Sequence, residues 1–313
     1  MVVSTVSSQP AVDSDLARAT ALLRDADDVT LLAHVNPDAD ALGSALALGL
    51  ALHRRGVAVR VSFGEPMTTP ESLRDLDVAA LLVPAEAVPA APELLVTLDA
   101  ANVGRLGSLA GRVRTARRVL VVDHHASNTR FGTDHLVDEA AEATAVLVLR
   151  LLDELGTELD YDIARCLYAG LVTDTRCFRF ARPQTHLLAA RLLATGVHPE
   201  AECRALLDSH PFGWLGMLSS VLRRARLEPS AVRGLGLVHT VVRLRDAERL
   251  RTEEVESVID LVRTASEAEV AAVLKETAPL RWSVSLRAKQ HVDVSRAAIE
   301  LGEIGRASCR ERV

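Results

Sequence analysis

The stretch VTLLAHVNPDADALGS, residues 29–44, joins an apolar strand to a polar turn and then to a helix. Leucine and β-branched side chains predict the strand at 29–35. Asn36-Pro37 predicts the turn, and apolar periodicity predicts a helix over 41–55. The turn carries three potential metal ligands, which are His34, Asp38 and Asp40.

The two aspartates of this turn also have an ordinary structural explanation. Asp40 would cap the following helix, and Asp38 would be a solvated turn residue. For an isolated aspartate that explanation would be preferred, but His34 beside both carboxylates favours metal binding. Because the two aspartates are separated by one residue in an irregular loop, each could face a different ion.

Strands and helices alternate through the first two thirds of the chain, which is the pattern of a parallel sheet covered by helices. Further strands are expected at 57–63, 93–99 and 117–125. Further helices are expected at 140–155, 161–174, 184–195 and 199–208. The sequence therefore predicts an α/β fold built on a parallel sheet.

The pattern changes after His210-Pro211, where an amphipathic run leads to Arg226. A length of 313 residues favours two domains over one large core, and the boundary is expected between residues 195 and 225. Beyond it the sequence predicts a helix near 251–264 and strands at 234–243, 269–276 and 281–288.

Polar side chains end two more of the apolar strands. One strand ends in the triplet Asp123-His124-His125, and another ends in Asp99. A lone histidine or aspartate there would be an ordinary surface residue. Adjacent histidines, however, point in alternate directions, so one can bind a metal while the other faces a substrate. Because the carboxyl ends of parallel strands meet at one edge, these side chains are expected to converge with His34.

A further contribution comes from LYAGLVTDTRCFRF, in which Asp174 closes an apolar helical run. Taken alone, Asp174 is equally well explained as a polar cap. Charge counting favours a ligand, because four aspartates (Asp38, Asp40, Asp99 and Asp174) are balanced by two divalent cations, with His34 and His124 as neutral imidazoles. A ligand set of oxygen and nitrogen without thiolate fits Mn²⁺ or Mg²⁺ better than structural zinc.

Composition limits the other classes of function. The formal net charge is −6, which argues against a long electrostatic track for duplex DNA or RNA. The four cysteines have no C-x-x-C spacing and indicate neither a zinc clip nor a disulfide framework. No stretch approaches the ~20 apolar residues of a membrane span, and the N-terminus is not a secretory signal. A cytoplasmic protein is expected.

Together the segments HVNPDADALGS, LDAA, VVDHH and GLVTDTRCFRF resemble the DHH phosphoesterase family, and specifically its bacterial nano-RNase and pAp phosphatase branch. The triplet Asp123-His124-His125 is the one that gives the family its name. The match runs from about residue 15 to residue 302, with the segments in the family's order. The resemblance implies a parallel-sheet DHH domain followed by a smaller α/β domain, called DHHA1.

The resemblance implies two Mn²⁺ ions as cofactors, with Mg²⁺ as the alternative. The implied ligands are His34 and Asp38 for one ion, Asp40, His124 and Asp174 for the second, and Asp99 as a bridge between both.

The resemblance also implies the residues that act on the substrate. His125 would contact the scissile phosphate, and Asp123 would orient a histidine from behind it. Arg287 lies in an SLR segment like that of the family's second domain and is a candidate phosphate clamp, because its planar fork can hold two phosphate oxygens. Asn128 and Arg179 are further candidates for substrate binding.

One departure from the family concerns the C-terminus. The family continues from a segment like VSRAAIELG into a glycine-rich GGGH stretch, whereas Gly302 is followed here by EIGRASCRERV. The second domain is therefore expected to be truncated, with a sheet edge left unpaired. The expected organisation is a disordered leader (1–14), the DHH catalytic domain (15–195), a helical linker (196–224), a partial DHHA1 substrate-binding domain (225–302) and a non-native tail (303–313).

The implied function is Mn²⁺-dependent hydrolysis of short oligoribonucleotides (nanoRNA) and 3′-phosphoadenosine 5′-phosphate (pAp). A phosphodiesterase for pApA or cyclic dinucleotides is one alternative, and a catalytically impaired nucleotide-binding protein is another, because the GGGH stretch is missing. A RecJ-like exonuclease fits less well because aromatic residues make up only 3% of the chain, and a manganese pyrophosphatase fits less well because of the SLR segment. The expected partners are small nucleotides, with neither long duplex nucleic acid nor a membrane, and a homodimer is left open.

Overall fold

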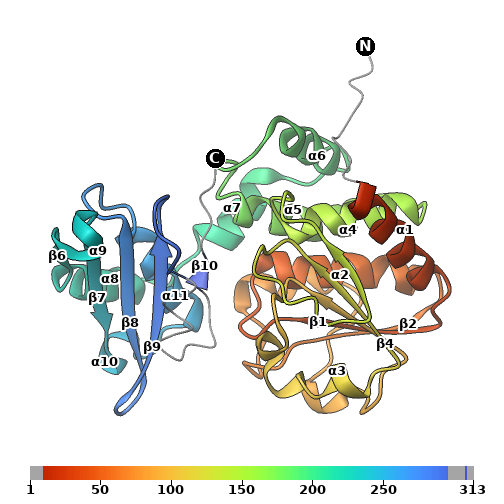
Figure 1. Ribbon diagram of the computed structural model, residues 1–313, viewed down its shortest axis with the longest axis horizontal. Helices are drawn as coiled ribbons and strands as arrows, with labels where there is room; N and C mark the ends of the chain where they lie inside the picture. The colour runs from red at the N-terminus through yellow and green to blue at the C-terminus, as the bar shows by residue number, and fades with distance from the viewer. Residues whose placement is uncertain (1–9, 295–306, 309–313) are drawn as a thin grey trace. The chain divides into compact units, whose positions relative to one another are not determined.

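The computed structural model describes residues 10–294 and 307–308, which form two compact units (Figure 1). The first unit runs to Ser209, and the second begins at His210. Each unit has its own sheet. The division falls inside the interval in which the sequence placed the domain boundary.

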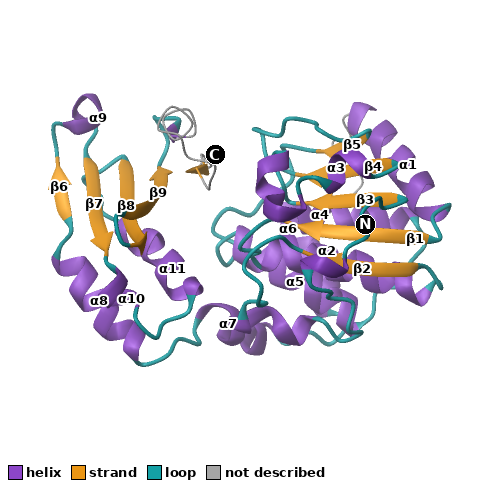
Figure 2. Cartoon of the chain, turned by 90° about the horizontal axis from the view of Figure 1, so that it is seen from below, coloured by secondary structure: helices purple, strands orange, loops and turns teal. Residues whose placement is uncertain are grey.

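A parallel sheet of five strands forms the centre of the first unit. Its strands are β1 (Asp28–Ala33), β2 (Ala58–Ser62), β3 (Leu94–Leu98), β4 (Arg118–Asp123) and β5 (Asp134–Val137). They lie side by side in the order β2-β1-β3-β4-β5 (Figure 2). This arrangement confirms the α/β fold that was expected from the sequence.

Both faces of this sheet are buried, which explains why its strands are apolar nearly throughout. In β1, Leu31 packs into the core on one face, whereas Leu32 packs into the core on the other face beside Leu106. β4 divides in the same way between Val122 and Val121. Since successive side chains of a strand alternate between two apolar cores, polar groups for chemistry can only be placed where the strands end.

Helices cover both faces of the sheet. The helices of this unit are α1 (Pro10–Arg24), α2 (Ala39–Arg54), α3 (Arg112–Thr115), α4 (Thr144–Glu154), α5 (Tyr161–Asp174), α6 (Pro183–Leu193) and α7 (Pro199–Leu207), of which α6 and α7 pack on α5. Short 3₁₀ helices are η1 (Glu71–Leu76), η2 (Ala85–Ala87) and η3 (Val103–Leu109). Helices α2, α4 and α5 lie on one face and α3 on the other (Figure 1). No helix within residues 10–294 has both the length and the apolar character that crossing a membrane would require.

Helix α2 lies between the sheet and α5, and residues 39–52 are all buried. A helix that is apolar all round is expected to be covered on all sides. At Gly43 a Cβ atom would lie 2.4 Å from the carbonyl oxygen of Cys166 in α5, so this close approach requires glycine. The contact holds the start of α2, which carries Asp40, against α5, which ends in Asp174.

The second unit contains a smaller mixed sheet with the order β10-β9-β8-β7-β6. Its strands are β6 (Arg226–Glu228), β7 (Leu237–Val242), β8 (Val270–Ala278), β9 (Arg281–Ala288) and β10 (Ala307–Ser308). Its helices are α8 (Gly213–Arg223), α9 (Ala231–Gly234), α10 (Leu244–Ala247) and α11 (Thr252–Val262). Val221 of α8 and Val258 of α11 pack with Val273 of β8 in the core of this unit.

Two segments of the first 224 residues differ from the expected organisation. α1 begins at Pro10, so residues 10–14 are helical and not part of a disordered leader, because Val12 and Leu16 of α1 are buried in the core. Residues 1–9 lie outside the described residues. The segment 196–224 is not a separate linker, since it holds α7 of the first unit and α8 of the second.

The sequence assigned 303–313 to a tail without strand pattern and expected the adjacent sheet edge to be unpaired. Ala307–Ser308 instead form β10, which pairs in parallel with β9 beside Leu286 and Arg287. Both expectations are therefore corrected at these two residues, and a strand this short shows no periodicity in sequence. The rest of 303–313 lies outside the described residues.

Candidate metal centre

The polar ends of β1, β3 and β4 meet at the carboxyl edge of the first sheet. His34 follows β1, Asp99 follows β3, and Asp123 closes β4 just before His124 and His125. β1 has β2 on one side and β3 on the other, so the switch point of the topology lies between β1 and β3. In open α/β sheets, ligands bind in the crevice at such a point.

One group of potential ligands consists of His34, Asp38 and Asp99, whose ligand atoms all lie within 4.8 Å of one another. The Nε2 atom of His34 is 3.4 Å from Oδ2 of Asp38 and 3.5 Å from Oδ2 of Asp99. Asp38 is also the N-cap of α2, because its Oδ1 accepts a hydrogen bond from the Ala41 N–H at 3.1 Å. Asp38, and not Asp40, therefore caps this helix, and its second oxygen faces His34.

A second group consists of Asp40, His124 and Asp174. The Nε2 atom of His124 is 3.3 Å from Oδ2 of Asp174 and 3.4 Å from Oδ1 of Asp99. Asp99 thus faces His34 of the first group with Oδ2 and His124 of the second group with Oδ1. A third group, made of Asp99, His124 and His125, overlaps with these two.

Main-chain carbonyls orient the two buried histidines. The Nδ1 atom of His34 lies 2.7 Å from the Val35 oxygen, and Nδ1 of His124 lies 3.2 Å from the Ala141 oxygen. A carbonyl only accepts hydrogen bonds, so this contact assigns the proton of each ring to Nδ1. Each Nε2 then presents its lone pair to the carboxylates, which is the arrangement of metal-binding histidines.

Asp40 is fully buried, and its carboxylate accepts hydrogen bonds from the N–H groups of Thr144 at 2.7 Å and Ala145 at 2.9 Å. Burial raises the pKa of Asp40, and the nearby charges of Asp99 and Asp38 raise it further, so that the pKa lies well above its ordinary value despite these two bonds. A divalent cation at this position would balance the crowded negative charge.

Asp99 has the opposite shift. Burial acts to raise the pKa of Asp99. The charges that His125, His124 and His34 carry when they are protonated, together with a hydrogen bond from His34, outweigh burial and hold the pKa well below its ordinary value. Its backbone has a φ of 57°, in the left-handed region that aspartate tolerates better than most residues. Such a conformation at the end of a strand is typical of a functional position.

Behind these groups, Asp123 orients His125. The Oδ1 atom of Asp123 lies 2.7 Å from Nδ1 of His125 and also accepts the His124 N–H at 2.9 Å. Its Oδ2 accepts a hydrogen bond from the amide of Asn128 at 2.6 Å. Asp123 is fully buried, whereas the side chain of His125 is 33% exposed. The buried carboxylate therefore fixes a histidine that remains accessible.

The structure brings all six predicted metal ligands together. The three predicted substrate-binding residues come from three different segments of the chain. Asn128 also donates to the Ala100 oxygen at 3.2 Å and accepts the Arg130 N–H at 2.7 Å, so both ends of its amide contact the protein. Arg179 is exposed in the turn after α5, and Arg287 lies on β9 in the second unit. Their contacts with substrate stay predictions.

Four residues of the site were not indicated by the sequence. The Ala141 carbonyl orients His124, and the N–H groups of Thr144 and Ala145 bind Asp40. At Gly170 in α5, a Cβ atom would lie 2.6 Å from Oδ1 of Asp40. The contacts with His124 and Asp40 are made through the main chain or depend on the lack of a side chain, so the residue types give no signal for them.

Gly170→Ala is expected to displace the Asp40 carboxylate and weaken Mn²⁺ binding by about 10- to 100-fold, the usual effect of losing support behind a ligand. Isothermal titration calorimetry of the metal-free protein measures this affinity. Gly216→Ala in α8 is the matched control, because a Cβ atom there meets nothing within 4 Å. Unchanged Mn²⁺ affinity in Gly170→Ala would show that Asp40 is not held as described.

The donor atoms of the centre fit a divalent cation. The three groups contain only carboxylate oxygens and imidazole nitrogens. This mixture suits Mn²⁺ and similar ions, whereas structural zinc sites commonly use thiolates. The charge of Asp99 helps to raise the pKa of the buried Asp40 carboxylate, and a bound cation would relieve that repulsion.

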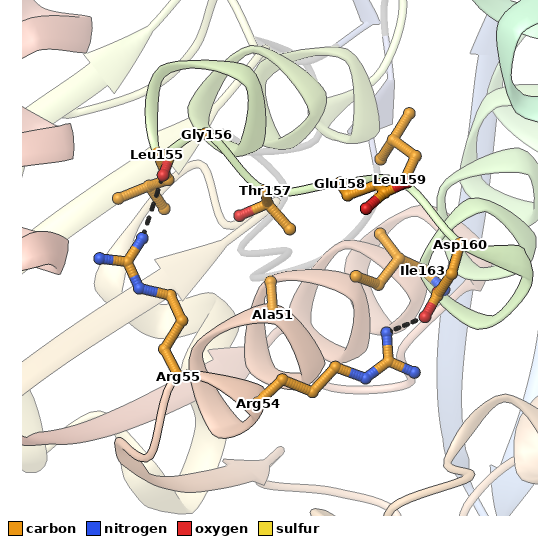
Figure 3. Close-up of a pocket in the computed structure, with 10 residues that line it drawn as sticks. All are labelled: Ala51, Arg54, Arg55, Leu155, Gly156, Thr157, Glu158, Leu159, Asp160 and Ile163. Carbon is orange, nitrogen blue, oxygen red and sulfur yellow. Dashed lines mark hydrogen bonds and ion pairs between the residues drawn. The ribbon is translucent and has the colours of Figure 1, made fainter.

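A separate open concavity of about 530 Å³ lies at the C-terminal end of α2 (Figure 3). Arg54 pairs there with Asp160 and Asp162, and Arg55 donates to the Leu155 oxygen at 3.2 Å. None of the metal-centre residues lines it. The chemistry is therefore concentrated at the strand ends and not in this concavity.

Known proteins share both the sequence and the fold. The sequence profile of the DHH family, N-terminal domain, matches residues 28–171. The chain is 32% identical over 281 residues to the bifunctional oligoribonuclease and PAP phosphatase NrnA of Thermus thermophilus, covering 88% of this chain and 80% of that protein. It is 27% identical over 161 residues, about half of each protein, to a probable manganese-dependent inorganic pyrophosphatase of Streptococcus mutans.

The fold is also similar to the crystal structure of an exopolyphosphatase-related protein from Bacteroides fragilis, with a TM-score of 0.81 and 18% identity, covering 92% of this chain and 87% of that one. The donor set and the manganese-dependent relative together support the use of a divalent metal. The long alignment with the Thermus protein, together with the DHH triplet at the end of β4, establishes the family. The chain belongs to the DHH family of hydrolytic phosphoesterases.

Proposed function

We propose that this protein is a manganese-dependent phosphoesterase that hydrolyses short oligoribonucleotides and pAp. The observation that carries the proposal is the convergence of two ligand groups through Asp99, with one oxygen facing His34 and the other facing His124. The name of the Thermus relative, an oligoribonuclease and PAP phosphatase, supports the substrate class.

In this proposal two ions occupy the centre. His34 and Asp38 would hold one, Asp40, His124 and Asp174 would hold the other, and Asp99 would bind both. Bound divalent ions lower the pKa of water and neutralise charge on phosphoryl oxygens. The protein's own contribution is to hold the carboxylates in place and to exclude other ligands from the buried side.

The accessible side of the centre is suited to a phosphate. Asp38, Asp174 and His125 have side chains that are 36%, 28% and 33% exposed, whereas Asp40 and Asp99 are buried. A substrate phosphate can therefore approach from the side of these three residues. His125, held by Asp123, would bind the scissile phosphate there and stabilise the charge that develops on it. Arg287 and Arg179 stay predicted ligands of the other phosphate groups.

The test is product release from pAp, pApA, a cyclic dinucleotide and a trinucleotide RNA, each with Mn²⁺, with Mg²⁺ or with a chelator. We expect Mn²⁺-dependent release of mononucleotides from the RNA and of phosphate from pAp, and no release with the chelator.

Arg287→Ala should raise KM more than it lowers kcat, because the residue is expected to bind phosphate away from the reacting bond.

The alternatives give different results in the same assay. Faster turnover of pApA or the cyclic dinucleotide than of RNA and pAp would show that these are the substrates. The proposal of metal-dependent hydrolysis would then still hold. Tight binding of pAp with no release from any substrate would instead identify a nucleotide-binding protein and overturn the proposal.

A further inference from the structure

Thr144 contacts one carboxylate from each of the two main ligand groups. It is the first residue of α4 and is fully buried. Its N–H donates to Oδ2 of Asp40 at 2.7 Å, and its hydroxyl donates to Oδ1 of Asp99 at 2.9 Å. A buried residue that contacts one carboxylate through its main chain and the other through its side chain can fix their orientation relative to each other.

The hydroxyl contact matters because Asp99 has to use both of its oxygens. Oδ2 lies 3.5 Å from Nε2 of His34, and Oδ1 lies 3.4 Å from Nε2 of His124. The terminal torsion of aspartate is broad, so the carboxylate can rotate unless a partner holds it. A donor on Oδ1 restricts that rotation. Threonine supplies the donor from a branched side chain whose own χ1 torsion is stiff.

The main-chain contact holds Asp40 through the start of α4. The N-cap residue of α4 is Ala143, which offers no side-chain cap, and both oxygens of Asp40 accept from the first helical N–H groups instead. Free N–H groups at a helix start and the helix dipole both favour an ionised carboxylate. The start of α4 thus supports Asp40 through the main chain and Asp99 through the Thr144 hydroxyl.

We infer that Thr144 is a positioning residue, whose hydroxyl aligns the bridging carboxylate of Asp99 with the group of Asp40, His124 and Asp174. The inference rests on the proposed metal centre. It assigns Thr144 no contact with substrate or ion. The competing explanation is that Thr144 only starts and packs helix α4, in which case its hydroxyl would have no effect on metal binding.

Two substitutions separate these explanations. Thr144→Val keeps the branched shape and the main-chain N–H but deletes the hydroxyl, whereas Thr144→Ser keeps the hydroxyl. We expect Thr144→Val to bind Mn²⁺ about 10- to 100-fold more weakly, as for other groups that orient metal ligands. Its kcat should fall, while its KM for pAp should change little. Thr144→Ser should retain both properties within about threefold, because it preserves the hydrogen bond to Asp99.

The readouts are Mn²⁺ titration calorimetry of the metal-free protein, its unfolding temperature, and kcat and KM on pAp at saturating Mn²⁺. Thr20→Val is the matched control, since Thr20 is a buried residue of α1 whose hydroxyl donates to the Leu16 oxygen at 2.8 Å. It should shift the unfolding temperature without changing Mn²⁺ affinity. If Thr144→Val does not fold, Thr144→Ala compared with Thr144→Ser provides the same test.

Two results would overturn the inference. Thr144→Val could bind Mn²⁺ as tightly as the wild-type protein, or Thr144→Ser and Thr144→Val could lose Mn²⁺ affinity equally. In either case the hydroxyl would not be what positions Asp99. Absence of Mn²⁺ binding in the wild-type protein is a different result. It would reject the proposed metal centre itself and with it the positioning role.

Discussion

Asp99→Asn is expected to abolish nearly all phosphoesterase activity, lowering kcat by about 10³-fold or more. Asp99 is the residue whose two oxygens face His34 and His124, so its charge serves both ligand groups. Asparagine keeps the shape but removes the negative charge and leaves one oxygen instead of two. Metal ions contribute several kcal/mol to such reactions, and about 1.4 kcal/mol corresponds to a tenfold change in rate.

The measurements are turnover of pAp with saturating Mn²⁺ and the number of Mn²⁺ ions bound per chain. Asp25→Asn, at an exposed position after α1, is the matched control and should leave both unchanged. Near-wild-type turnover by Asp99→Asn would exclude Asp99 as the residue that joins the two groups.

His125→Ala should lower kcat by about 10²- to 10³-fold, the usual cost of removing one donor that stabilises charge in the transition state. Mn²⁺ affinity should stay close to that of the wild-type protein. The reason is that His125 is held by Asp123 on the accessible side of the centre, whereas the two main ligand groups consist of six other side chains.

This experiment is informative because His125 also belongs to the third ligand group, with Asp99 and His124. A lower number of bound Mn²⁺ ions in His125→Ala would make the residue a ligand and contradict its assignment to the phosphate. His53→Ala, at an exposed position in the last turn of α2, controls for the loss of a histidine and should have little effect.

Much of the first unit could be predicted because the residue types of its strands reflect their burial on both faces of the sheet. β1, β3 and β4 are buried on both faces, so their inner residues are almost all apolar, and the first histidine or aspartate after the apolar run marks the edge of the sheet. The four-residue strand β5 was missed because it is too short for such a pattern. Helix α1 overlapped the expected leader because the polar run Asp13-Ser14-Asp15 separates Val12 from the apolar residues of the later turns.

In the second unit, too, the longer strands could be predicted from the sequence and the shortest one could not. β7, β8 and β9 were expected from their apolar alternation, and each is present close to its expected position. The pairing of Ala307–Ser308 with β9 is a long-range contact, and the types of two residues are too few to predict it. Pairing between distant segments depends on which edge is available in space, and local propensity carries no information about that.

By itself, the sequence determined which residues could bind metal. His34, Asp99 and His124 follow apolar strands, Asp174 closes an apolar helix, and Asp38 and Asp40 lie at the start of the next helix after β1. The ability to bind a metal is a property of the side chain itself, so it can be read from the residue type. Only the tertiary structure decided how they are used. It made Asp38 the cap of α2, turned the two oxygens of Asp99 towards different groups, and placed Gly170 and Thr144 against Asp40. Those roles depend on main-chain groups and on close approach between elements, which arise when α2, α4 and α5 pack on the sheet and cannot be read from any one segment.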